Sequence, residues 1–313
     1  MRKQLRNTMR NTLRVLLLAG TSLTPLLAAH AAQTGQEASR AQELLAQART
    51  ALGGEAQFKA IQSLSVSGSA RRITGMGEID GDMSIDIQMP DKFRRGDAIS
   101  PMPGMDVTTT QIVNGADASI DVDSSGGGGG MFTQMGRGQA TPEMKAMAER
   151  GVRLEYARTM ILLLLAAPGS FPVEFRYSGE EETSGKMADV LEAKGPENFA
   201  AHLYLDQKTH QPIMLTYKER ARPNMQIRMG GGGGESREEM QRKAQDAMAK
   251  NATAEEDVEV QLRIVDYKAT GGISFPHKVT KTTAGKVSEE REYSKYKINP
   301  ALKPERFKKK EQS

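Results

Sequence analysis

The segment from Val258 to Ile298 constrains the fold more than any other part of the chain. It alternates apolar and polar residues in three runs, and a period of two is typical of strands with one buried and one exposed face. The turns at 271–272 and 284–286 contain glycine, which adopts positive φ without steric cost. Strands joined by such short turns must be antiparallel, because parallel strands need a long crossover. The segment therefore predicts an antiparallel meander with one apolar face.

Further alternating runs predict that most of the chain is β-structure. The clearest has apolar residues at every second position from Met83 to Met89. Asn114-Gly115 is a strong hairpin signal between two other runs. In addition to the segment above, strands are predicted at 64–73, 78–89, from Lys92 onward, and at 108–113, 118–122, 173–177, 187–193, 200–206 and 212–219.

Two helices are predicted among these strands. Residues 38–52 place leucine and alanine at spacings of three and four, and Gly53-Gly54 ends the pattern as a C-cap. The second helix begins after Thr141, which has the side chain of an N-cap. We expect an interruption of this helix at Gly151.

The end of the second helix, from Met160 to Ala167, is apolar on every side. Such a segment must be surrounded by protein or fill a cavity, and it is too short to cross a bilayer. Leu162–Leu165 therefore form either an ordinary core helix or a lid or plug over a ligand site.

The N-terminus has the features of a secretory signal peptide. Basic residues without any acidic one precede an apolar core, and Ala29-His30-Ala31 fits the cleavage rule of small residues. The sequence predicts cleavage near Ala31 and a periplasmic mature protein without a transmembrane segment. Without residues 1–31 the chain has 38 basic and 39 acidic residues, so its pI near 9.1 is no argument for nucleic-acid binding.

Glycine-rich stretches divide the mature chain. Runs of five glycines lie within about 124–139 and about 230–257, and neither has the Gly-Lys-Ser/Thr of a phosphate-binding loop. We predict a signal peptide at 1–31, one domain at 32–302 with these two insertions, and a basic tail at 303–313.

Catalysis and metal binding find little support in the sequence. The chain has no cysteine, and its mature histidines, His202, His210 and His277, fall in different predicted elements. It lacks the HExxH and Gly-x-Ser-x-Gly motifs, and the methionines of its loops have no helper histidines for a soft metal. We therefore expect no enzyme, no cofactor and no metal, with a hydrolase as a remote third hypothesis.

Three motifs resemble the LolA-like superfamily of periplasmic lipoprotein carriers and lipid-carrier relatives. Residues 90–94 resemble its Pro-x-x-Phe-Arg strand crossing. Residues 205–212 resemble its hairpin with Asp, Thr and Pro, and 266–276 with 299–307 resemble its closing strands. The resemblance covers most of the chain after the leader, apart from the two glycine-rich insertions.

This resemblance implies an α+β fold, an incompletely closed antiparallel β-barrel with helices packed on its concave face. It also implies a hydrophobic cavity for acyl chains. One position departs from the pattern, because the proteobacterial carrier has a lid-latching arginine where this chain has Met89.

An acyl chain binds through apolar burial, worth about 0.8 kcal/mol per CH₂, and needs no catalytic group. Flexible methionine suits such a wall. The same apolar faces are also what an ordinary closed core would show. The predicted lining consists of Met83, Ile85, Ile87, Met89, Phe93, Leu162, Leu165, Leu203, Leu205, Ile213, Leu215, Leu262, Ile264, Phe275 and Val279.

Two functions follow from this sequence. The first is a non-enzymatic periplasmic carrier or sensor of lipid or lipoprotein acyl chains, with an envelope protein as donor or acceptor. The alternative is a structural or protein-interaction module of the cell envelope, whose sheet closes on itself and leaves no ligand cavity.

Overall fold

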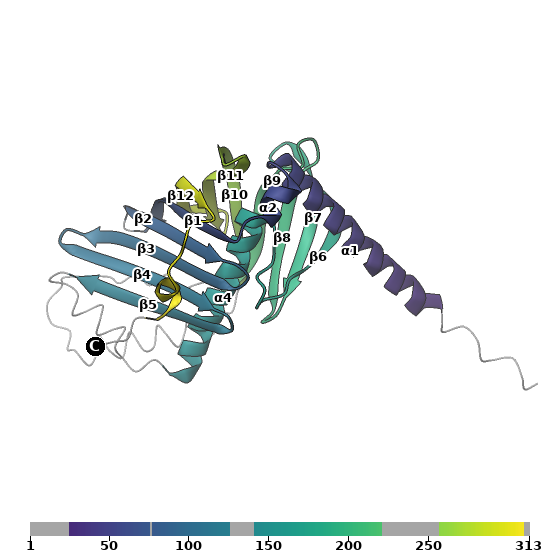
Figure 1. Cartoon of the computed structure of the whole chain (residues 1–313). Helices are drawn as coiled ribbons and strands as arrows, with labels where there is room; N and C mark the ends of the chain where they lie inside the picture. The colour runs from purple at the N-terminus through teal and green to yellow at the C-terminus, as the bar shows by residue number, and fades with distance from the viewer. Residues whose placement is uncertain (1–24, 76, 126–140, 221–256, 310–313) are drawn as a thin grey trace, which may run out of the picture.

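Two antiparallel meanders meet at the centre of a single sheet in the computed structural model, which describes residues 25–75, 77–125, 141–220 and 257–309 (Figure 1). The first meander consists of β1 (Ser63–Thr74), β2 (Gly77–Gln88), β3 (Lys92–Met102), β4 (Met105–Asn114) and β5 (Asp117–Ser125). The second consists of β6 (Glu174–Thr183), β7 (Lys186–Gly195), β8 (Phe199–Asp206), β9 (Pro212–Arg220), β10 (Asp257–Thr270), β11 (Ile273–Thr283) and β12 (Lys286–Ile298).

The pairing of β1 with β12 joins the two meanders. It runs from Leu64 opposite Ile298 to Arg72 opposite Glu289, with a register shift at Gly68. A Cβ at Gly68 would lie 1.9 Å from the carbonyl oxygen of Glu292, so only glycine allows this approach of the two backbones.

In the described part of the chain the sheet has 12 strands, in the order β5-β4-β3-β2-β1-β12-β11-β10-β9-β8-β7-β6, and it stays open between β5 and β6. The fold class is therefore confirmed as a curved antiparallel sheet that forms an incomplete barrel. The meander predicted at 258–298 is also confirmed, as β10, β11 and β12.

The helices pack on the concave face. Within the described residues they are α1 (Pro25–Ala51), α2 (Glu55–Lys59) and α4 (Pro142–Leu164). The first begins well before the predicted residue 38 and ends at Gly53 and Gly54, both at positive φ, as predicted. Its residues Leu44 and Leu45 are buried in the main core.

The helix α4 crosses the concave face because of the strand order. It follows β5 and precedes β6, and these are the two edges of the sheet. The chain must therefore travel from one edge to the other, and a helix of 23 residues covers about 34 Å. Thr141 caps its N-terminus as predicted, accepting a hydrogen bond from the Met144 backbone NH at 3.3 Å. The helix passes through Gly151 without the predicted interruption, since Gly151 is exposed and nothing crowds it.

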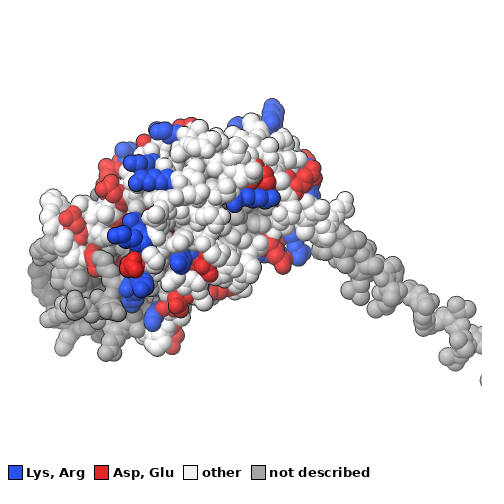
Figure 2. All heavy atoms as spheres, viewed as in Figure 1, with Lys and Arg blue, Asp and Glu red and all other residues white. Residues whose placement is uncertain are grey.

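The convex face carries the C-terminal segment. The 3₁₀-helix η1 (Pro304–Phe307) lies in front of β3 to β5 in Figure 1. Phe307 is buried there, and Arg306 donates two hydrogen bonds, at 2.6 and 3.0 Å, to the carboxylate of Asp86. Acidic and basic side chains are interspersed over the face seen in Figure 2. The predicted glycine-rich insertions fall almost entirely outside the described residues.

Replacing Arg306 by alanine should lower the free energy of unfolding by about 1–3 kcal/mol, because Asp86 is 1% exposed and its carboxylate would lose two hydrogen bonds. Among the described side chains, Ser65 would remain as its partner. Urea denaturation measures the change, with the exposed Lys303→Ala as the matched control. A variant as stable as the control would show that η1 does not hold this face.

Candidate functional site

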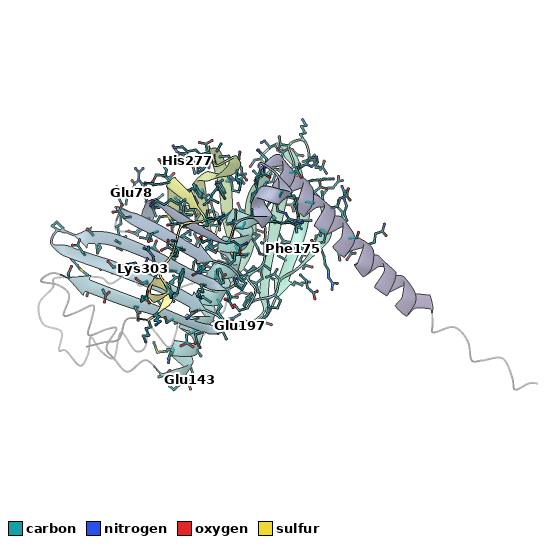
Figure 3. The ribbon with its side chains drawn as sticks, viewed as in Figure 1. Glu78, Glu143, Phe175, Glu197, His277 and Lys303 are labelled. Carbon is teal, nitrogen blue, oxygen red and sulfur yellow. The ribbon has the colours of Figure 1, made fainter. Side chains whose placement is uncertain are left out.

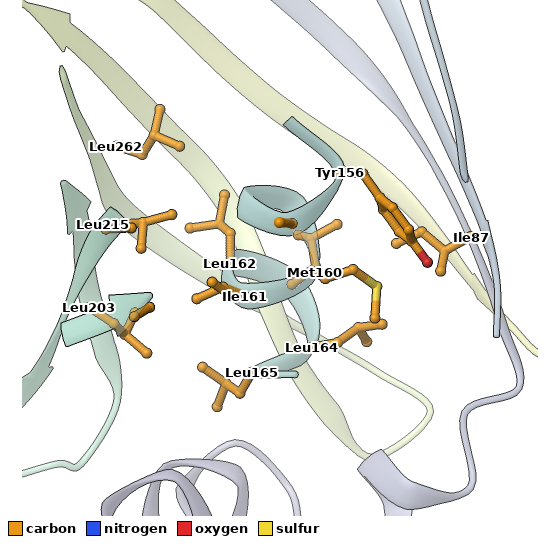
Figure 4. Close-up of a cluster of buried hydrophobic side chains, with 14 of the residues drawn as sticks. Ile87, Tyr156, Met160, Ile161, Leu162, Leu164, Leu165, Leu203, Leu215 and Leu262 are labelled. Carbon is orange, nitrogen blue, oxygen red and sulfur yellow. The ribbon is translucent and has the colours of Figure 1, made fainter. Parts of the chain in front are cut away.

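The apolar half of the concave face lies under the C-terminal half of α4. Figure 4 shows Tyr156 beside Ile87 on one side of this helix, and Leu162 directed toward Leu215 on the other. All residues from Thr159 to Leu165 are buried. The helix therefore fills the space between the two halves of the sheet with apolar side chains.

The structure brings most of the predicted lining residues together. One buried core cluster contains 13 of them, and Met89 packs against it half-buried. The members of the cluster are Met83, Ile85, Ile87, Phe93, Leu162, Leu165, Leu203, Leu205, Leu215, Leu262, Ile264, Phe275 and Val279.

Ile213 does not belong to this surface, and its predicted place was wrong. The pairing of β8 with β9 matches Tyr204 with Met214 and Leu205 with Pro212, which leaves Ile213 as an unpaired bulge residue. Its side chain packs instead on a separate small cluster with Met214 and Tyr204.

The expected open hollow is occupied by the chain itself. The side chains of α4 take the volume that the sequence assigned to acyl chains. Two open hollows of about 420 and 360 Å³ lie on the convex face and are lined mostly by charged or polar side chains. Neither has the apolar lining that an acyl chain needs.

A group of charged residues forms the other half of the concave face. We name it the floor network: Arg72, Arg95, Asp97, Glu289 and Arg291. All but Arg72 have at most 9% of their surface exposed. Arg95 lies 2.9 Å from Asp97 and 3.6 Å from Glu289, while Arg291 lies 2.6 Å from Glu289. Arg72 lies 2.7 Å from Asp97, so the five side chains are continuous.

Glu155 connects α4 to the floor network. Its carboxylate lies 2.5 Å from the Arg95 guanidinium and 4.0 Å from that of Arg291. One turn further along the helix, the Arg158 guanidinium stacks 3.7 Å from the centre of the Tyr217 ring. The helix is thus fixed by ion pairs on its polar side and by leucines at its end.

Burial and charge act in opposite directions on these carboxylates. Burial alone raises the pKa of Glu289, but Arg291 and Arg95 outweigh it and lower the pKa to about 2. Burial also opposes ionisation of Glu155 and Asp97, and the neighbouring arginines again hold both pKa values below their usual ones. All three carboxylates are therefore ionised in the folded protein at neutral pH.

The stability from Glu289 should disappear in acid. A depressed pKa contributes stability that is complete above the unfolded value of 4.5 and is lost as the pH falls toward about 2. The Tm of the wild type should fall across this window, and that of Glu289→Gln should start lower and fall less. Parallel curves for the two proteins would contradict the assignment.

The C-terminus and the middle of α4 are also anchored. Arg49 of α1 donates a hydrogen bond to the carbonyl oxygen of Leu165 at 2.9 Å, which places a cation at the C-terminus of the helix. The Tyr156 hydroxyl reaches the carbonyl oxygen of Pro90 at 3.3 Å, and Arg153 lies 2.6 Å from Glu197. Met89 cannot supply an ion pair to this helix, which is contacted instead by Arg49, Arg95 and Arg291.

The floor network was absent from the sequence predictions, although the sequence contains a signal for it. Arg95 and Asp97 lie two and four residues after the buried Phe93 on β3, so their side chains point to the same face of the sheet. Arg291 lies two residues before Tyr293 on β12 and likewise points to the same face as that ring. Charged residues at positions of an apolar face must be paired with one another, because an isolated buried charge is very costly.

The three histidines beyond the predicted leader lie apart, on β8, in the turn after it and on β11. Figure 3 places His277 at the top of the molecule and Glu197 near its lower side. Among the described residues, no group of three or more His, Cys, Asp or Glu side chains could hold a metal ion. Within that same part of the chain, the helices lack an apolar stretch of the length that a bilayer requires.

Comparisons with known proteins give structural matches alone. Neither the scan of protein families nor the search of curated proteins found a match. An outer membrane lipoprotein-sorting protein domain from Vibrio parahaemolyticus aligns over 86% of this chain and 97% of its own, at 10% identity and a TM-score of 0.44. A LolA superfamily protein from Nitrosomonas europaea aligns over the same shares, at 11% identity and a TM-score of 0.44. A DUF1329 family protein from Desulfovibrio piger aligns over 88% and 97%, at 8% identity and a TM-score of 0.43.

Proposed function

We propose that this chain is a periplasmic, non-enzymatic carrier or sensor of lipid or lipoprotein acyl chains, and that α4 occupies the acyl site when no ligand is bound. The observation that carries the proposal is the covering of the concave apolar face by one crossover helix. From Met160 to Leu165 this helix is apolar on every side and completely buried. The predicted signal peptide and the LolA-like motifs support the compartment and the class of ligand.

An exchange between helix and lipid is energetically feasible. Burial of a large apolar side chain is worth about 1.5–3 kcal/mol, so Met160 to Leu165 together contribute on the order of 10–15 kcal/mol. An acyl chain of ~16 carbons contributes about 12 kcal/mol at about 0.8 kcal/mol per CH₂. The two burial free energies are close, so neither the helix-filled nor the lipid-filled state is favoured overwhelmingly. The displaced leucines then need an apolar cover, which a donor or acceptor protein of the envelope would supply.

Uptake of a fluorescent fatty acyl probe tests the proposal. Leu162→Ala should increase uptake several-fold, because truncation of a buried leucine weakens the packing of α4 by about 2–5 kcal/mol. Met147→Ala is the matched control, since Met147 lies on the same helix with 60% of its surface exposed. It should leave uptake unchanged.

Native mass spectrometry of the protein released gently from the envelope gives an independent reading. The carrier should show added masses of lipid or acylated peptide. A clean ligand-free mass, together with no uptake by wild type or Leu162→Ala, would contradict the carrier and favour a structural module in which α4 never leaves the sheet.

A further inference from the structure

The charge balance of the concave face depends on α4. The floor network contains three guanidinium groups, on Arg72, Arg95 and Arg291, but only two carboxylates, on Asp97 and Glu289. Glu155 of α4 supplies the third carboxylate. With the helix in place these six groups balance, and the helix also brings the Arg158 guanidinium to Tyr217. Without the helix, one positive charge of the floor network remains uncompensated.

This surplus charge lies directly beside the apolar half of the face. Arg95 is two residues from Phe93 on β3, and Arg291 is two residues from Tyr293 on β12, so each pair shares one face of its strand. Both aromatic rings are buried in the main core. A ligand that takes the place of α4 would therefore contact arginines at one end and an apolar surface at the other.

The helix itself has the same division. Its carboxylate at Glu155 and the middle of its apolar end at Leu162 are seven residues apart, about 10 Å along the axis. Apart from the Arg158 guanidinium that stacks on Tyr217, the helix thus presents an anionic group and an apolar body to the sheet. An acidic lipid has the same two features.

We infer that the site prefers a lipid with an anionic headgroup, which Arg95 and Arg291 bind in place of the Glu155 carboxylate. This inference rests on the proposed function and adds the class of lipid to it. A phosphodiester suits the site well, because arginine pairs with phosphate through two parallel hydrogen bonds.

Loading from vesicles tests the preference. The mature chain is incubated with vesicles of phosphatidylglycerol or of phosphatidylcholine with identical acyl chains, and is then separated from them. Lipid in the protein fraction is counted by mass spectrometry, so that adhesion of the basic tail to acidic vesicles does not contribute. The wild type should carry several-fold more phosphatidylglycerol than phosphatidylcholine, and salt should reduce the difference.

Variants identify the groups responsible. Arg95→Gln and Arg291→Gln should bring the ratio of bound phosphatidylglycerol to bound phosphatidylcholine near one, while phosphatidylcholine uptake persists. Arg95→Lys should keep much of the preference for phosphatidylglycerol. Arg94→Gln, on the convex face, is the control for loss of one arginine. Glu155→Gln should raise total uptake with the preference retained, and it keeps the test informative if an arginine variant does not fold.

The possible failures are distinguishable. Equal loading of both lipids by the wild type would overturn the anionic preference and leave the carrier proposal standing. Loading of neither lipid, by wild type and Glu155→Gln alike, would overturn both. A preference that survives in Arg95→Gln and Arg291→Gln would show that other groups select the headgroup.

Discussion

Replacement of Arg95 by alanine should lower the free energy of unfolding by about 3–5 kcal/mol, because removing one partner leaves buried charges uncompensated. Arg95 contacts three carboxylates, those of Asp97, Glu155 and Glu289. Its loss leaves Asp97 with Arg72 and forces Glu155 to depend on Arg291 at 4.0 Å. Urea denaturation followed by circular dichroism measures the effect.

The adjacent residue provides the control for Arg95. Arg94 has the opposite side-chain direction on β3, where it is half-buried near the convex hollow. Arg94→Ala should change the free energy of unfolding by less than about 1 kcal/mol, as most substitutions near the surface do. Equal effects of the two substitutions would mean that the floor network adds nothing specific to the attachment of α4.

The second large effect is expected from Leu163→Asp. Leu163 is 2% exposed, and an unpaired carboxylate there would cost several kcal/mol if it stayed buried. We expect α4 to leave the concave face, because its removal returns the charge to water. The variant should bind an environment-sensitive hydrophobic dye and take up lipid faster than the wild type, while its spectrum keeps the β-signal of the sheet.

Met147→Asp tests whether this effect is specific to the buried side of α4. Met147 is exposed on the same helix, so the same change of chemistry should leave dye binding and lipid uptake at wild-type levels. Complete loss of the β-signal in Leu163→Asp, in the presence of lipid as well as without it, would show that α4 is an inseparable part of the core.

The strands were predictable from sequence because each depends on neighbouring residues. Alternation and glycine turns specify β10, β11 and β12, and these signals do not need the rest of the molecule. Thr141 likewise identified the start of α4 through its local capping chemistry. The hairpin after β8 was also predictable, since Asp206 accepts hydrogen bonds from the backbone NH groups of Lys208 and Thr209.

The role of α4 was not predictable in the same way. Its course across the concave face follows from the positions of β5 and β6 at opposite edges, which only the complete strand order reveals. Whether Leu162 to Leu165 cover a hollow or fill it depends on the volume between two distant halves of the sheet. The bulge at Ile213 is a third example, because the pairing with β8 sets its direction rather than its own alternation.

The floor network was predictable in part, less than the strands and more than the role of α4. The parity of Arg95, Asp97 and Arg291 on their strands indicates that they face inward. Their partner Glu155 is on a helix far away in sequence, and the phase of that helix over the sheet depends on tertiary packing. Sequence could therefore show that the arginines need partners, but it could not identify this carboxylate.

Hydrogen exchange of α4 during lipid loading tests the central claim most directly. In the ligand-free protein the amides from Val152 to Leu164 should exchange slowly, because the helix is buried against the sheet. In the lipid-loaded protein the same amides should exchange much faster, while those of β1, β2, β8 and β9 stay protected. Bound lipid with α4 as protected as before would contradict the claim that helix and acyl chains share one site.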